Sequence, residues 1–236
     1  MRIAALSALL LSAAWPVSAG AWGQDSKSAD QIVVYLIDHQ FLPLEELSTI
    51  KAEVEAIFGD AGLKISWIAD MSPRRRLHRN ELRVIILPSD GTNWFHGPSN
   101  IIGIAPHDDR GIGRNCFVFY RQAIWFRQQA VSRCREAVQA RTEAATRGVE
   151  IDPYIDSMAP YDCGDRLPSL TALIVARTAA HEMVHILLNK LDHSPHGLMR
   201  NAFDIGDLWM VDGRASFRLG RNELTALHTI SATGSH

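Results

Sequence analysis

Apolar positions in the first half of the chain follow the periods of several strands and one helix. Residues 32–38 (Ile-Val-Val-Tyr-Leu-Ile-Asp) are β-rich and almost continuously apolar, which predicts a buried strand. A helix is predicted from Pro43 to about Phe58, because apolar residues recur there at helical spacing, at Leu47, Ile50, Val54 and Phe58. Further strands are predicted at 63–69, 82–87, 101–105 and 116–120. This order predicts an α+β fold, in which a mixed sheet has helices packed on one side.

The second half of the chain is predicted to be mainly helical. The segment 121–150 is rich in Arg, Gln, Glu and Ala, and it predicts an exposed helix with a narrow apolar stripe, formed by Ile124, Val131, Cys134 and Val138. A more apolar helix is predicted from about Pro168 to Leu188. Arg177 interrupts its apolar face, and we expect the stem of this side chain to pack while its charge reaches water. Asn189 can adopt the left-handed conformation that ends a helix, and 220–230 predicts a closing helix.

The composition is typical of a globular protein, with 47% hydrophobic and 21% charged residues among 236. A formal net charge of -2 argues against nucleic acid as a partner. The N-terminus resembles a secretory signal, because Arg2 precedes the apolar run 3–15 and Val17-Ser18-Ala19 offers a cleavage site. We therefore expect removal of 1–19, one domain over 20–236 and a secreted or periplasmic location. No other stretch is expected to be long and apolar enough to cross a membrane, so we expect no membrane partner after signal removal. A retained N-terminal anchor is the alternative.

Three cysteines bear on this expected location. An oxidising destination permits one disulfide among Cys116, Cys134 and Cys163 and leaves one thiol. Their spacing matches neither a zinc knuckle nor a redox motif, so the pairing stays open.

The segment His181-Glu182-Met183-Val184-His185 carries the candidate chemistry. Two histidines four positions apart on a helix differ by about 40° around its axis, so both imidazoles can reach one ion. Glu182 projects about 100° from His181, beside the metal, where it can move a proton between water and a leaving group. Zinc suits this set, because it accepts imidazole ligands and acidifies its water. The alternative is a histidine pair that packs in the helix without metal.

A catalytic zinc usually has three protein ligands and keeps one position for water. Asn189-Lys190-Leu191-Asp192 provides a chain reversal, and His193 follows it, twelve positions after His181. We therefore predict His193 as the third ligand. The spacing leaves four alternatives, which are His196, Asp204, Asp207 and Glu223.

These residues resemble the metzincin metallopeptidases. The run 181–185, followed by His193-Ser194 and Gly197-Leu198-Met199, is most similar to the matrixin branch. The resemblance implies His193 as a zinc ligand, Met199 in a turn beneath the metal, and a zincin-like fold. In that fold a mixed sheet precedes the active-site helix, and a small C-terminal subdomain follows it. The metzincin pattern has glycine and histidine where this chain has Leu188 and Leu191, so the resemblance is to a divergent member.

The sequence therefore predicts a zinc metallopeptidase that hydrolyses peptide bonds in extracellular or periplasmic proteins. A peptide would add to an edge strand, for which 101–105 and 116–120 are the candidates. Three residues are candidate oxyanion donors, which are Tyr154, Tyr161 and Arg200. The rival functions are a non-catalytic zinc-binding module and a zinc hydrolase of a non-peptide amide, such as a cell-wall link. Glu182 argues against the first, because metal binding alone does not need that carboxylate.

Overall fold

The structure is a computed structural model, and it describes residues 31–69, 76–89, 101–151, 153, 163, 167–202 and 217–233. The expected signal segment 1–19 lies outside the described residues. Four side chains that the sequence offered as candidates also lie outside them, which are Tyr154, Tyr161, Asp204 and Asp207.

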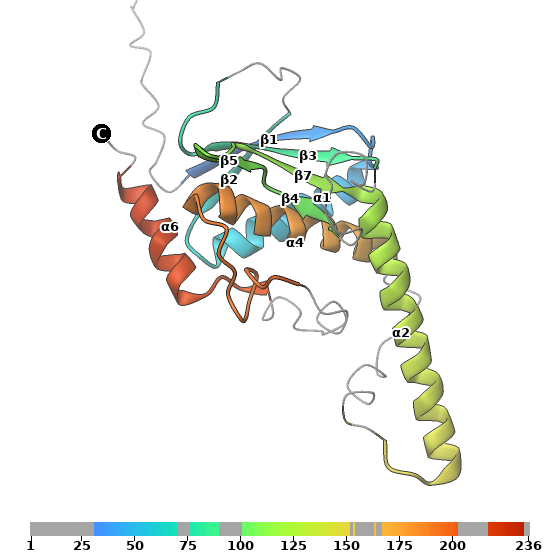
Figure 1. Cartoon of the computed structure of the whole chain (residues 1–236). Coiled ribbons are helices and arrows are strands. Elements are labelled where there is room, and N and C mark those ends of the chain that lie inside the picture. Colours follow the sequence, from blue (N-terminus) through green and yellow to red (C-terminus); the bar gives the residue numbers. More distant parts are fainter. Residues whose placement is uncertain are drawn as a thin grey trace, which may run out of the picture.

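A five-stranded mixed sheet forms one layer of the molecule (Figure 1), in the order β2–β1–β3–β7–β4. Its strands are β1 (Gln31–Asp38), β2 (Lys64–Ala69), β3 (Glu81–Leu87), β7 (Asn115–Phe119) and β4 (Gly103–Ile104). The first four run parallel, and β4 pairs antiparallel with β7. The α+β prediction with a mixed sheet is confirmed. Of the two candidate edge strands, β4 lies at the edge and β7 lies inside the sheet.

Two helices, α1 (Leu44–Gly59) and α4 (Leu167–Leu188), lie together against one face of this sheet (Figure 1). The buried faces of the strands and of both helices share one hydrophobic core. A third helix, α6 (Arg221–Thr233), packs on α4 near the C-terminus. The helix α4 therefore lies at the centre of the described fold, where the sheet, α1 and α6 all contact it.

This central position accounts for the strong apolarity of α4. The stretch Ser169–Leu188 is long and apolar enough to cross a membrane by length and composition, but 94% of its most apolar window is buried in the protein. Our expectation that no stretch beyond the signal has such a composition was therefore wrong. Burial also corrects the prediction for Arg177. Only 4% of this residue is exposed, and its guanidinium Nε lies 2.9 Å from the Oε1 atom of the buried Glu53, so its charge does not reach water.

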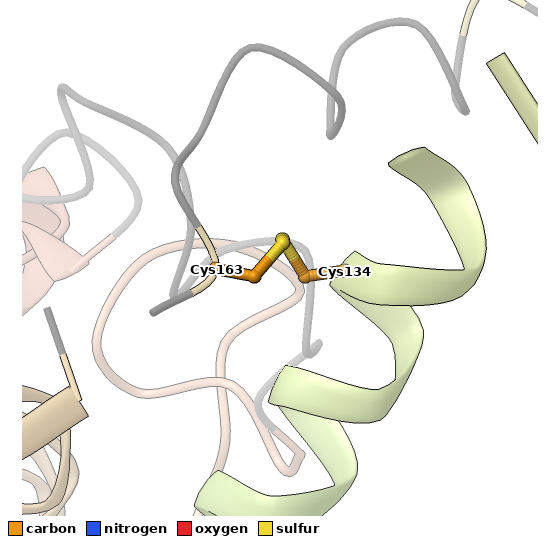
Figure 2. The surroundings of a disulfide bond; sticks show 2 residues. All are labelled: Cys134 and Cys163. Atoms are coloured by element: carbon orange, nitrogen blue, oxygen red, sulfur yellow. A yellow bond between two sulfur atoms is a disulfide. The ribbon is translucent and has the colours of Figure 1, made fainter. Parts of the chain in front are cut away.

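The helix α2 (Tyr120–Arg147) projects away from the sheet (Figure 1) and is close to the predicted range. Its buried face consists mainly of small side chains, which are Ala123, Ala130, Val131, Cys134 and Ala137. The predicted apolar stripe was wrong at Val138, which is 37% exposed. A disulfide joins Cys134 to Cys163 (Figure 2), and Cys116 is a buried free thiol. The pairing that the sequence left open is thus resolved.

A small hairpin was not predicted. It consists of β5 (His107–Asp108) and β6 (Gly111–Ile112), and it follows the edge strand β4. The backbone N–H of Ile112 donates to the side-chain oxygen of Asn189 at 2.9 Å. The hairpin is therefore attached to the end of the central helix, next to the predicted metal site.

Candidate metal centre

The central helix α4 presents its histidine pair and Glu182 at its C-terminal end. His181, Glu182 and His185 are all buried, with exposed fractions of 7%, 8% and 4%. Their spacing places both imidazoles on one side of the helix, and the two Nε2 atoms lie 3.0 Å apart. The helix thus delivers two ligand atoms to one point, as the sequence predicted.

The chain reverses directly after this helix and brings a third imidazole to the same point. Asn189 has a φ of 50°, so the helix ends in the predicted left-handed conformation. The ring of His193 then lies 5.3 Å from that of His181 and 4.9 Å from that of His185, measured between ring centres. One ring nitrogen from each histidine falls in a cluster whose atoms lie within 4.8 Å of one another. These three side chains can hold a metal ion.

The hydrogen bonds of the two buried imidazoles fit a metal between them. The Nδ1 atom of His181 lies 2.8 Å from the carbonyl oxygen of Leu198, and Nδ1 of His185 lies 2.7 Å from that of Lys190. A carbonyl oxygen only accepts, so each Nδ1 carries a proton and each neutral ring keeps a bare lone pair on Nε2. Two lone pairs that face each other at 3.0 Å repel, and a shared cation removes that repulsion. Backbone carbonyls commonly fix the tautomer of metal-binding histidines in this way.

The electrostatics of the site favour neutral imidazoles. Burial lowers the pKa of His181 to about 4, although its bond to Leu198 opposes the shift. Burial also lowers the pKa of His185. A metal ion requires deprotonated imidazole nitrogens, so both shifts suit ligation. Burial raises the pKa of Glu182 to about 8, opposed by a hydrogen bond from the backbone of Ala105. Such a carboxyl group can change its protonation state near neutral pH.

A pocket of about 670 Å³ opens over this cluster and is bordered by the edge strand β4. The strand approaches α4 closely at Gly103. A Cβ atom there would overlap the methyl group of Thr178 and lie 3.2 Å from Cγ of Glu182. Glycine is therefore required for the edge strand to lie directly on α4. The pocket is also lined by His107 of the hairpin and by Trp125, which projects from α2.

The loop after His193 is held by several bonds. The backbone N–H of Ser194 donates to the carbonyl of Met199 at 2.7 Å, and that of Leu198 donates to the carbonyl of Arg218 at 2.9 Å. The hydroxyl of Ser194 donates to the carboxylate of Glu223 on α6. Met199 is 3% exposed and packs in the core.

Two of the other candidate ligands lie outside the histidine cluster, and the other two lie outside the described residues. Glu223 is absent from the described cluster, and its carboxylate is engaged by Ser194. His196 is exposed and also lies outside the described cluster. Asp204 and Asp207 lie outside the described residues. Among the candidate oxyanion donors, Arg200 lines the same pocket as Glu182.

Sequence reasoning missed three residues around the centre: Gly103, His107 and Trp125. Their places depend on contacts with distant parts of the chain, and no local pattern marks them. The sequence matches no model of a known protein family and no curated protein at a significant level. The inference about function therefore depends on the site itself.

Proposed function

We propose that this chain is a zinc metallopeptidase with a zincin-like arrangement, exported to an extracellular or periplasmic location. The observation that carries the proposal is the group of three imidazoles around one point, with Glu182 beside them in the same pocket. Three neutral nitrogen ligands and an open pocket are typical of catalytic zinc sites, whereas structural sites are usually closed by a fourth protein ligand. The disulfide between Cys134 and Cys163 supports an oxidising destination.

Each side chain of the site would have a separate role in peptide hydrolysis. His181, His185 and His193 would hold the ion, which when bound supplies Lewis acidity and lowers the pKa of water to about 7. Glu182 would take the proton from the attacking water and deliver it to the leaving amine. A hydrogen bond from the backbone of Ala105, the residue after β4, would help to hold this carboxylate in place. Arg200 lines the pocket and would stabilise negative charge on the substrate oxygen.

The position of the edge strand supports a peptide as the substrate. Among the described strands, β4 pairs only with β7, and it borders the pocket that contains the histidines. An extended peptide can add to such an edge by main-chain hydrogen bonds, which places its carbonyl groups along the pocket. A volume of about 670 Å³ accommodates side chains as well as backbone.

The decisive experiment measures zinc content and peptide-library cleavage for the mature protein and for Glu182→Gln. The variant is expected to retain stoichiometric zinc and to lose about 10²–10⁴-fold in kcat/KM, because the proton-transfer group is gone while the ligands remain. His193→Ala should lower zinc content, and His196→Ala serves as the matched control that keeps it. Zinc retained by the mature protein without cleavage of any peptide would contradict the peptidase proposal. Cleavage of cell-wall amides instead would identify the non-peptide substrate class.

A further inference from the structure

The third imidazole of the cluster differs from the other two in how it is held. His181 and His185 are buried, and each has Nδ1 bonded to a backbone carbonyl. His193 is exposed, and among the described residues no hydrogen bond holds its ring. Its direction therefore depends on how firmly its backbone is fixed.

Ser194, the next residue along the chain, fixes the backbone at this point. Ser194 is bonded through both its backbone and its side chain, to the carbonyl of Met199 at 2.7 Å and to the carboxylate of Glu223. The first bond is local, within the loop. The second bond spans 29 positions and reaches α6, where Glu223 occupies the first turn. The loop is thus tied to a separate element of the fold.

The helix α6 is held in place by its packing against α4, which keeps Glu223 within reach of Ser194. Leu227 is buried on α6, and the helix packs against α4, which bears His181 and His185. The residue before the helix is Gly220, and its missing side chain leaves the space that the Glu223 carboxylate occupies. Glu223 therefore ties the loop that carries the third imidazole to α6, which packs on the helix that carries the other two.

From this geometry we propose that Glu223 is a positioning residue for the metal site, acting through Ser194 to fix the direction of His193. The inference rests on the proposed metal site. It assigns to α6 the task of completing a three-imidazole set for a divalent transition-metal ion. A carboxylate suits this task, because it only accepts hydrogen bonds and so commits the serine hydroxyl to donate. Residues that orient metal ligands typically contribute 10–100-fold to metal affinity.

The test measures the zinc dissociation constant by competition with a chromophoric chelator. Ser194→Ala and Glu223→Ala are each expected to weaken zinc binding by about 10–100-fold, and the double variant should be no weaker than either single variant. Glu223→Gln keeps an acceptor oxygen for Ser194 and should restore most of the affinity. Asn222→Ala, on the same turn of α6, is the matched control and should bind zinc like the wild type. The visible spectrum of the cobalt-substituted protein should change in the two alanine variants only.

The outcomes separate this inference from the proposed function. If the wild type binds no divalent metal, both are overturned. If it binds zinc and Glu223→Ala binds equally tightly, only the positioning role is overturned. Full affinity in Ser194→Ala with loss in both Glu223 variants would make Glu223 a ligand instead, which also overturns the proposal. If Asn222→Ala weakens zinc binding as much as Glu223→Ala does, the loss of affinity comes from a less stable α6, and the positioning role is overturned. Thermal unfolding of the metal-free variants identifies any that fail to fold.

Discussion

At the scale of single residues, Arg177 shows that a buried ion-pair partner allows a charged side chain to be buried where the sequence predicts exposure of its charge. Its place on an apolar helix face predicted a side chain whose charge reaches water. In the structure the guanidinium pairs with Glu53, and it also lies over the ring of Phe217 at 4.1 Å. The partner is 124 positions away in sequence, so no local pattern could have revealed it.

This buried pair leads to a stability prediction. Arg177→Met should lower the free energy of unfolding by about 3–5 kcal/mol, because it removes the positive charge that pairs with the buried carboxylate of Glu53. Urea denaturation measures the loss. The double variant Glu53→Leu/Arg177→Met removes both charges and should recover much of it, because well-packed apolar replacements of buried pairs are often neutral or stabilising. If the double variant is as unstable as the single, the uncompensated charge is not the cause.

At the scale of elements, the contact between β4 and α4 depends on one glycine. Gly103→Ala should destabilise the protein by about 1–3 kcal/mol, because the added methyl group overlaps Thr178 in a packed interior. The displaced strand should also weaken the proposed peptidase activity, since Cγ of Glu182 lies beside the same position. Thermal unfolding and kcat/KM measure the two effects.

The matched control for this prediction is Gly113→Ala. Among the described residues, a Cβ at Gly113 would meet only the carbonyl oxygen of Pro106, at an ordinary distance of 3.5 Å. Its stability should remain within about 0.5 kcal/mol of the wild type, as is usual for substitutions away from packed contacts. Equal losses in the two variants would show that chain flexibility, rather than overlap with α4, accounts for the result.

The length of each element explains whether the sequence could predict it. The strand β1 and the helices α1 and α4 have apolar runs or periods long enough to identify them. The strand β4 and the hairpin strands contain two residues each, too few for any period to appear. Strand order depends on pairing between distant segments. For that reason the sequence offered two edge candidates, and the structure was needed to choose β4.

The candidate site shows the same difference between what local sequence predicts and what depends on distant segments. The spacing of His181, Glu182 and His185 along one helix predicted their common direction, and the turn at Asn189 predicted the return of His193. These five positions lie within thirteen consecutive residues. Residues that support them come from β4 and from α6, which meet the site only in the folded chain. Local sequence therefore predicted the candidate ligands, but not what holds them in place.

At the scale of the whole molecule, the disulfide ties the projecting helix α2 to the chain just before α4, the helix that carries His181 and His185. Cys134 lies on the buried face of α2, and Cys163 precedes the start of α4 by four positions (Figure 2). The bond closes a loop with a sequence separation of 29. It therefore restricts the unfolded chain in the region between two elements that pack together in the fold.

Removing this bond should lower stability without removing the metal site. For a loop of this length the chain-entropy model gives a loss of about 3–4 kcal/mol, which Cys134→Ala/Cys163→Ala should show in urea denaturation at saturating zinc. Zinc stoichiometry should be unchanged, because the three imidazoles come from α4 and the loop after it. Cys116→Ala is the control, and it should leave the disulfide intact and cost only the small cavity that it creates. In the wild type the Cys116 thiol should react with alkylating reagents only after unfolding, since burial raises its pKa well above the ordinary value. An unchanged unfolding midpoint in the double variant would mean that the bond does not stabilise the fold.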